Sequence, residues 1–410
     1  MKYMKKTALK KYARLIARVG ANVQKGQEVS ITAGLDQPEF VKLLAEECYR
    51  AGARKVRVEW TYDPLQKVHA RWMKQADLAR VEDWEKAKLQ HMVDALPVRI
   101  LLESSDPDGL TGIHPRFFKA MQKRAAVVKP YRDAIDNRHQ WCIAAVPGRE
   151  WAKKLYPALT ARQAVEQLWK DILFTSRADG EDPVAAWEAH NRDLKERCAY
   201  LNSLGLRELR YSSSIGTDLT VGLLPRGRFQ AGADTTLEGV VFDPNIPTEE
   251  VFTSPDRSTA EGIVYATKPL SYQGQLIENF SVRFGKGRVT EVRAEKGQAV
   301  LEHILSMDEG SRYLGECALV PKESPVNLSG ILFYNTLFDE NAACHLALGA
   351  GFNECVDGFE SMSREDLAAM GVNDSVTHVD FMIGSDDLSI DAVTADGRTV
   401  PVFRNGTWAF

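Results

Sequence analysis

The chain has 410 residues, of which 44% are hydrophobic and 26% are charged, and its formal net charge is -4. This composition is typical of a folded globular protein, and the balance of charge provides no electrostatic basis for binding nucleic acid or an anionic membrane surface. The length favours two domains over one compact core. The sequence contains no run of eighteen apolar residues, so it predicts no membrane-spanning helix.

The first twenty residues, MKYMKKTALKKYARLIARVG, have a basic beginning like that of a signal peptide. Lysine and arginine recur every few residues and no apolar segment follows, so we expect an amphipathic helix of the mature protein. The six cysteines are scattered and form no CxxC pair, which favours reduced thiols and a cytoplasmic protein.

Residues 1–205 alternate between helical and strand patterns. The segment EVSITAGL predicts a strand, QPEFVKLLAEECYRAGA a helix, and KVRVEWTY a second strand, with further strands at VRILLES and WCIAAVP. This order is typical of βαβ units, so we expect an α/β amino-terminal domain with a mainly parallel sheet. No GxGxxG or GxxxxGK[ST] motif follows a strand, so nucleotide binding by this domain has only a general fold analogy in its favour.

The pattern changes after the long helical segment DPVAAWEAHNRDLKERCAYLNSLG. From residue 206 onward, short alternating segments separated by Gly, Pro, Asn and Asp predict a largely antiparallel sheet, and FGKGR is typical of a hairpin turn. Helices are expected at GQAVLEHILS and at ENAACHLALGAG. We therefore expect an α+β carboxy-terminal domain over residues 206–410, with the metal-binding and catalytic residues in it.

Two histidines of this domain lie among apolar and acidic residues. In THVDFMIGSDD, His378 and Asp380 share one face of a predicted strand, and a buried carboxylate there requires a cation, a hydrogen-bond donor or water. His345 lies among alanines and leucines of the helix expected at ENAACHLALGAG. A single histidine in either setting is more often a hydrogen-bonded core residue than a metal ligand.

Two glutamate positions complete the candidate group. Glu316 precedes the apolar run CALVP, and its alternative role is a hydrogen bond to the backbone of a turn. Glu249 and Glu250 follow Thr248, so both could instead be first-turn acids of a helix capped by that threonine. The local pattern does not choose between these two glutamates.

Three carboxylates and two imidazoles are the ligand chemistry of two divalent first-row ions. Two such ions that share a carboxylate activate water and polarise a carbonyl group. The candidate ligands are Glu250, Glu316, His345, His378 and Asp380.

Four segments of this domain, NIPTEEVFTSP, GECALVP, FYNTLFDENAACHLALG and THVDFMIGSDDLSIDAVTADGRTVPVFRNGTWAF, resemble the M29 family of metalloaminopeptidases, the group of aminopeptidase T, AmpS and PepS. The resemblance extends over the whole chain. It implies a cytoplasmic enzyme that uses two divalent ions, zinc, cobalt or manganese, to remove amino-terminal residues from peptides. It also implies a homodimer whose active sites face an internal cavity.

Carried over residue by residue, the resemblance places the family's metal ligands on the five candidates and selects Glu250 over Glu249. Family members commonly have a tyrosine seven places after His345, where this chain has Phe352. Phenylalanine can neither bind a metal nor donate a hydrogen bond, so either another group, with Tyr334 and Glu354 as candidates, takes over that role or the activity is weakened or altered.

The mechanism expected from these residues is attack of an activated water on the peptide carbonyl next to a free α-amino group. Glu340 is our candidate for the proton relay, and the alternative is a helix-start acid. Two other functions stay open: a metallohydrolase that acts on another amide or ester, and a catalytically degenerate dimer that retains the fold.

Overall fold

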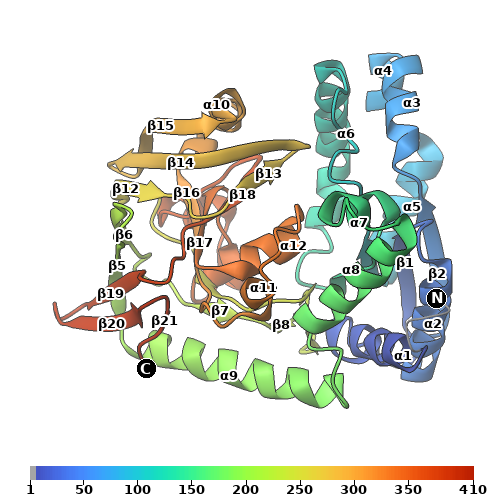
Figure 1. Cartoon of the computed structure of the whole chain (residues 1–410), viewed down its shortest axis with the longest axis horizontal. Coiled ribbons are helices and arrows are strands. Elements are labelled where there is room, and N and C mark those ends of the chain that lie inside the picture. Colours follow the sequence, from blue (N-terminus) through green and yellow to red (C-terminus); the bar gives the residue numbers. More distant parts are fainter. Residues whose placement is uncertain (1–5) are drawn as a thin grey trace. The chain divides into compact units, whose positions relative to one another are not determined.

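The computed structural model describes residues 6–410, which divide into two compact units (Figure 1). The first unit comprises residues 6–188 and 233–247, and the second comprises residues 189–232 and 248–410. The division predicted at residue 205 differs from these two units in two respects. The long helix α9 (Pro183–Ser203) crosses the boundary, and the segment 233–247 returns to the first unit.

The first unit is built on a five-stranded sheet in the order β10-β4-β3-β1-β2, in which every pair is parallel. Its strands are β1 (Glu28–Gly34), β2 (Lys55–Thr61), β3 (Val98–Glu103), β4 (Trp141–Ala145) and β10 (Asn245–Ile246). A separate two-stranded sheet pairs β8 (Asp234–Thr235) with β9 (Val241–Phe242). The predicted α/β domain with a parallel sheet is confirmed.

Helices connect the parallel strands of this unit. The amino-terminal helix is confirmed from Lys6, and residues 1–5 of that prediction lie outside the described part of the chain. The helices are α1 (Lys6–Leu15), η1 (Ile16–Gly20), α2 (Pro38–Ala51), α3 (Pro64–Trp72), α4 (Gln75–Ala79), α5 (Asp83–Ala95), α6 (Pro115–Asp133), α7 (Arg149–Leu155) and α8 (Ala161–Thr175). Helix α2 buries Phe40, Leu44 and Cys48, whose spacing of four residues places them on one face.

The second unit contains two antiparallel sheets. The smaller has the order β18-β17-β16-β11-β7, with β7 (Gln230–Ala231), β11 (Val251–Thr253), β16 (Leu314–Leu319), β17 (His345–Gly349) and β18 (His378–Met382). The larger contains β5 (Leu206–Ser212), β6 (Asp218–Gly222), β12 (Glu261–Tyr265), β13 (Leu270–Tyr272), β14 (Gln275–Gly285), β15 (Arg288–Lys296), β19 (Ser389–Thr394), β20 (Thr399–Arg404) and β21 (Thr407–Trp408). These pairings confirm the predicted antiparallel class.

Short helices complete this unit. They are α10 (Gln298–Ile304), η2 (Gly310–Arg312), α11 (Pro325–Leu328), α12 (Thr336–Asp339), η3 (Glu340–Ala342), η4 (Asn353–Cys355), η5 (Phe359–Ser361) and α13 (Arg364–Ala369). The predicted helix at GQAVLEHILS is α10, and FGKGR is the β14–β15 hairpin turn. Lys286 (φ 51°) and Gly287 (φ 79°) form that turn, and a Cβ on Gly287 would lie 1.9 Å from the Arg257 carbonyl oxygen, so only glycine fits.

One face of the smaller sheet packs against the larger sheet. Cys317 of β16, Leu346 of β17 and Phe381 of β18 belong to the shared hydrophobic core, and the Phe381 ring lies 5.8 Å from that of Phe280 in β14. Because side chains alternate along a strand, the neighbours of these residues point to the opposite face. That opposite face carries the candidate ligands.

The helix predicted at residues 340–351 is wrong. Glu340–Ala342 is a short 3₁₀ turn, and His345–Gly349 is the central strand β17, in which all five residues are buried. A short apolar run that is covered on both faces has no alternation, so its pattern cannot be distinguished from that of a buried helix. Glu249 and Glu250 also start no helix, because they lead into strand β11.

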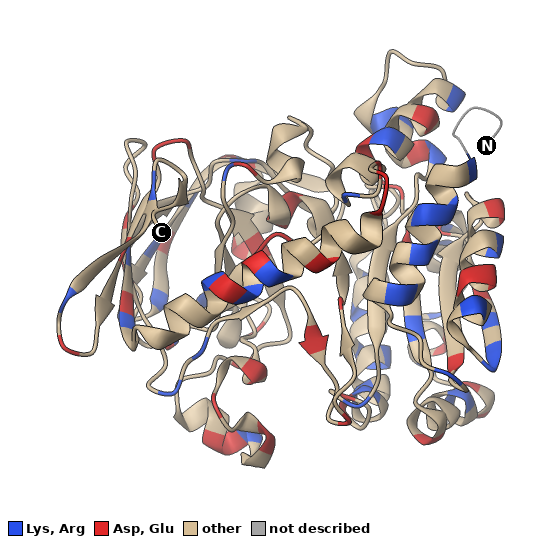
Figure 2. Cartoon of the chain, turned by 90° about the horizontal axis from the view of Figure 1, so that it is seen from below, with Lys and Arg blue, Asp and Glu red and all other residues tan. Residues whose placement is uncertain are grey.

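Lysine and arginine are interspersed with aspartate and glutamate over both units, and α9 carries both signs of charge along its length (Figure 2). Within residues 6–410, no helix combines the length and the apolar character that crossing a membrane requires.

Candidate metal centre

The register of three neighbouring strands brings the candidate ligands to one face of the smaller sheet. Glu316 of β16 lies opposite Ala347 of β17, and Ala347 lies opposite Asp380 of β18. Side chains at directly opposed positions share a face of the sheet, so the two carboxylates flank Ala347, whose single methyl group leaves room above it. His345 lies on the same face two residues earlier along β17, and His378 lies two residues before Asp380.

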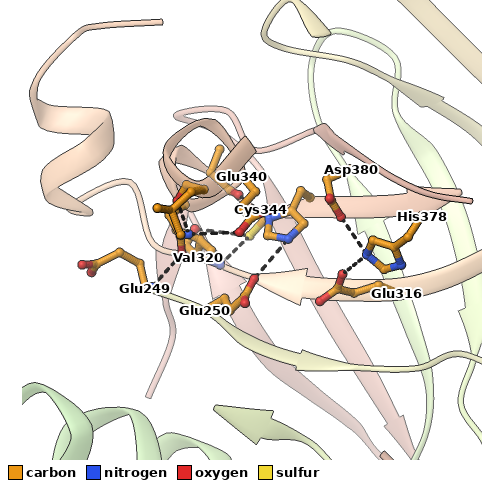
Figure 3. Close-up of polar contacts among 12 residues, drawn as sticks. Glu249, Glu250, Glu316, Val320, Glu340, Cys344, His378 and Asp380 are labelled. Atoms are coloured by element: carbon orange, nitrogen blue, oxygen red, sulfur yellow. Dashed lines mark hydrogen bonds and ion pairs between the residues drawn. The ribbon is translucent and has the colours of Figure 1, made fainter. Parts of the chain in front are cut away.

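Contacts between side chains join these residues into one cluster (Figure 3). His378 Nε2 lies 3.1 Å from Glu316 Oε2 and 3.2 Å from Asp380 Oδ1. His345 Nε2 lies 3.2 Å from Oε2 of Glu250, which immediately precedes β11. Figure 3 shows Glu250, Glu316, His378 and Asp380 converging on one region.

Two groups of three ligands overlap in this cluster. One group is Glu250, Glu316 and His345, the other is Glu316, His378 and Asp380, and within each the ligand atoms lie within 4.8 Å of one another. Glu316 belongs to both groups. A carboxylate shared between two sets of donors is the arrangement that bridges two adjacent metal ions.

The hydrogen bonds of the two histidines direct their other nitrogen atoms into the cluster. His345 Nδ1 donates to the Ala343 carbonyl oxygen at 3.2 Å, and His378 Nδ1 donates to the Ala350 carbonyl oxygen at 2.8 Å. Because a carbonyl oxygen only accepts, Nδ1 carries the hydrogen in both rings. The Nε2 atoms therefore face the carboxylates, as in histidines that bind metal through Nε2 and donate from Nδ1.

Burial and like charges shift the pKa values of this cluster. Burial raises the pKa of Glu316 to about 7, the hydrogen bond from His378 opposes this, and the charge of Glu250 adds to it. Burial also raises the pKa of Glu340 well above its usual value, with further contributions from Asp380 and Glu250. Burial by itself lowers the pKa of His345, but the hydrogen bond to Glu250 and that glutamate's charge outweigh this effect and raise it to about 10.

The chain does not compensate this negative charge with its own strong cations. No lysine or arginine among residues 6–410 forms an ion pair with Glu250, Glu316, Glu340 or Asp380. Asp380 Oδ1 is buried and accepts no hydrogen bond, because the single Nε2 atom of His378 cannot serve both carboxylates fully. A buried carboxylate oxygen that accepts no hydrogen bond fits a cation, and nitrogen and oxygen donors without thiolate fit zinc, cobalt or manganese.

The structure separates the two adjacent glutamates that the local sequence could not distinguish. Glu249 is directed away from the cluster (Figure 3), and its Oε1 lies 3.9 Å from His190 Nε2. Its backbone N–H donates to Asn341 Oδ1 at 2.7 Å. Glu250 faces His345 instead.

Glu340 lies in the 3₁₀ turn η3, not at the start of the helix expected there. It borders a small cavity together with Asp380 and Met382, so its carboxyl group is on the side of the cluster formed by β18. Asn341, which is fully buried, donates from Nδ2 to the Leu337 carbonyl oxygen of α12 at 3.0 Å, and the bond that its Oδ1 accepts from the Glu249 N–H ties η3 to the segment before β11. Sequence reasoning missed this asparagine, which directly follows Asp339 and Glu340 and carries no local signal of its role.

Phe352 lies against the imidazole that completes the second group of ligands. Its ring centroid is 5.0 Å from that of His378 and 5.2 Å from that of Phe252. Its backbone N–H donates to Ser254 Oγ at 2.7 Å, which fixes the loop after β17. Glu354, one of the two candidates to replace a tyrosine hydroxyl, belongs to neither group of three ligands.

Comparisons with known proteins identify the family of the chain. The family model described as thermophilic metalloprotease (M29) matches residues 5–408. The chain is 42% identical to aminopeptidase AmpS of Bacillus subtilis, over 98% of each chain, and 41% identical to aminopeptidase T of Thermus thermophilus, also over 98% of each chain.

The comparison of structures gives the same family. The solved structure of wild-type AmpT from Thermus thermophilus covers 99% of this chain and 100% of its own, with a TM-score of 0.90 and 40% identity. A dihydroxypyridine dioxygenase from Pseudomonas putida has 13% identity and a TM-score of 0.51, a likeness of fold alone. The chain therefore belongs to the M29 family of metalloproteases, and it is a metal-dependent peptide hydrolase of that family.

Proposed function

We propose that this protein is an aminopeptidase that releases amino-terminal residues from peptides with two divalent ions, one held by Glu250, Glu316 and His345 and the other by Glu316, His378 and Asp380. The sharing of Glu316 between two groups of ligand atoms is the observation that carries this proposal. Bound zinc, cobalt or manganese would supply an activated water and polarise the scissile carbonyl group.

The side chains of the cluster have distinct parts in this proposal. Glu316 holds the two groups together, and the two imidazoles, with Nδ1 bonded to backbone carbonyls, present Nε2 in a fixed orientation. Glu340 carries the proton from the attacking water to the leaving amine, because its pKa is raised and it borders the same small cavity as Asp380.

Hydrolysis of free-amine peptides and amino-blocked peptides by metal-stripped protein, restored with zinc, cobalt or manganese, tests this function. We expect metal-dependent cleavage of the free-amine peptides only, and two bound ions per chain by elemental analysis. Glu249→Gln is the matched control for Glu250→Gln, since Glu249 points away from the cluster. Retention of full turnover by Glu340→Gln would remove that residue from the proposed mechanism.

Phe352 supports a second candidate, a metallohydrolase that acts on another amide or ester. It presents no hydroxyl group to the site, although its ring lies against His378. Cleavage of the amino-blocked compounds would favour this second function. Phe352→Tyr, assayed beside the wild-type protein, measures whether a phenol at this position restores rate. Absence of metal-dependent turnover in both proteins would indicate a degenerate relative.

We also propose a cytoplasmic homodimer. All six cysteines are free thiols in the structure, which is consistent with a reducing compartment, and the assembly rests on the family resemblance. Sedimentation at several protein concentrations would test the dimer, and cell fractionation would test the location.

A further inference from the structure

Two half-buried aromatic residues lie beside the metal centre, and the first is Phe252 of β11. Phe252 lies opposite Ala318 of β16, and Ala318 lies opposite His345 of β17. Directly opposed residues share a face of the sheet, and their Cβ atoms are about 5 Å apart, so roughly 10 Å separates Phe252 from His345. The ring of Phe252 therefore lies on the face that carries the candidate ligands.

The two glutamates of the first group of ligands are nearer to Phe252. Glu250 precedes Phe252 by two residues, and its contact with His345 at 3.2 Å shows that it points to the same face. Glu316 precedes Ala318 by two residues, so it occupies the position diagonal to Phe252 on the neighbouring strand, about 7–8 Å away. Phe252 thus borders the group formed by Glu250, Glu316 and His345.

The second aromatic residue, Phe352, extends this apolar surface to the other group of ligands. Its ring centroid lies 5.2 Å from that of Phe252, with 66° between the ring planes, and 5.0 Å from that of His378. Two rings in an edge-to-face arrangement do not cover each other's faces. Phe252 and Phe352 therefore form an aromatic wall that extends along the cluster from the first group of ligands to the second.

Hydrogen bonds hold the aromatic wall in place. Ser254, which is fully buried and follows Phe252 by two residues, accepts a hydrogen bond from the Phe352 N–H at 2.7 Å. Gln230 of the edge strand β7 lies opposite Phe252, and its Nε2 donates to the Glu354 carbonyl oxygen at 2.6 Å. Both bonds connect strands at this edge of the sheet to the loop that carries Phe352, so the wall is formed before any substrate binds.

The proposed reaction brings one substrate side chain close to the ions. In a peptide with a free amino terminus, the scissile carbonyl carbon is bonded to the Cα of the first residue, about 1.5 Å away. The side chain of that residue starts from the same Cα. A carbonyl group that is polarised by ions at the cluster therefore places the first side chain beside the ligands, where the aromatic wall is an apolar surface.

We propose that Phe252 and Phe352 bind the side chain of the substrate's first residue and select peptides that begin with a large apolar residue, such as leucine, methionine or phenylalanine. This inference rests on the proposed aminopeptidase function and specifies its substrate class. An apolar side chain is removed from water when it packs against the two rings, which is favourable. A polar side chain of the same size loses hydrogen bonds to water there and gains none from the rings.

Substrates that differ only in their first residue test this inference on the metal-loaded protein. We compare leucine, asparagine and alanine, because leucine and asparagine have nearly the same shape and differ in polarity. We expect kcat/KM for leucine to exceed that for alanine by at least about tenfold, and to exceed that for asparagine by a larger factor.

Phe252→Ala should reduce the ratio of kcat/KM between leucine and alanine to about threefold or less, and Phe352→Tyr, which keeps a ring, should retain the wild-type ratio. This ratio compares two substrates on one protein sample, so a loss of folded protein or of bound metal does not change it. Phe410→Ala is the matched control. Phe410 is also partly exposed and also contacts two rings, those of Tyr200 at 4.2 Å and Trp408 at 5.3 Å, and its removal should leave the ratio unchanged.

The outcomes separate this inference from the function on which it rests. Equal kcat/KM for leucine, asparagine and alanine in the wild-type protein would overturn the inference while the aminopeptidase stands, and this result needs no variant. A leucine preference that is unchanged in Phe252→Ala would also overturn it. No metal-dependent cleavage of any free-amine substrate would overturn the proposed function itself.

Discussion

Two buried glutamates, one in each unit, have opposite electrostatic environments. Glu28 of β1 is 8% exposed, and it is contacted by Arg54 at 2.8 Å, Arg57 at 2.6 Å and His91 at 3.1 Å. Glu316 of β16 is 3% exposed and contacts only His378, at 3.1 Å, among the basic side chains of residues 6–410.

The pKa values of the two carboxyl groups reflect this difference. The hydrogen bond from His91 and the charges of Arg57 and Arg54 lower the pKa of Glu28 despite its burial. Burial raises the pKa of Glu316 to about 7, because the hydrogen bond from His378 only partly opposes it. The comparison teaches that a buried carboxylate surrounded by the chain's own cations is a closed structural feature. A buried carboxylate without them is chemically suited to an external cation.

We expect the largest difference between Glu316 and Glu28 in catalysis, when each carboxylate is replaced by a neutral amide. Glu316→Gln removes the ligand shared by both groups, so we expect kcat/KM to fall on the order of a thousandfold, equivalent to several kcal/mol of transition-state stabilisation. Glu28→Gln should change kcat/KM by less than about twofold, because it lies in the other unit. Peptide hydrolysis and bound-metal analysis of both variants measure this contrast, and comparable losses in both would contradict it.

Removal of the metal ions by a chelator should destabilise the protein through the cluster that contains Glu316, and not through the surroundings of Glu28. At an ion concentration about 100 times the dissociation constant, binding to the folded state adds about 2.7 kcal/mol. For a chain of 410 residues we therefore expect the thermal midpoint to fall by about 3 °C for each ion removed. Glu28→Gln should show the same metal-dependent shift, and Glu316→Gln should lose most of it. A shift of equal size in Glu316→Gln would mean that the ions bind elsewhere.

The arginine-compensated cluster should contribute to stability without metal. Glu28→Gln leaves Arg54 and Arg57 without their carboxylate, but both arginine side chains are more than one third exposed, at 63% and 38%, so water screens much of the loss. We expect a decrease of about 1 kcal/mol in the free energy of unfolding, measured by denaturant titration of metal-free protein. Lys296→Gln, which breaks an exposed ion pair with Glu278, is the control and should cost less.

The smallest expected effect is the pH dependence of the contribution that Glu28 makes to the free energy of unfolding. Because the pKa of Glu28 is lower in the folded state than its ordinary value of 4.5, its stabilisation is complete above pH 4.5. It is lost as the pH falls through the folded-state pKa. The difference in unfolding free energy between wild type and Glu28→Gln should thus be constant from about pH 5 upward and shrink in acid. A difference that grows in acid would mean that the arginines do not stabilise the charged form.

Local pattern predicted the strand that carries one part of the candidate metal centre. The two-residue alternation in THVDFMIGSDD placed His378 and Asp380 on one face of a strand, as the structure has them. The same reasoning was wrong for His345, because β17 is buried on both faces and so carries no alternating pattern to distinguish a strand from a helix. For Glu249 and Glu250 the pattern offered no choice at all, since both are acids in one short irregular segment.

The sequence by itself determined the parallel sheet of the first unit, the antiparallel class of the second and the residue types of a site for divalent ions. These properties follow from local periodicity and side-chain chemistry, which neighbouring residues carry. Local pattern did not choose between Glu249 and Glu250, which only the family resemblance separated, and the tertiary structure shows that Glu250 faces His345 and that Glu316 belongs to both groups of candidate ligands. Those relations depend on the pairing of strands that are distant in sequence, where a slip of one residue would turn every side chain to the opposite face.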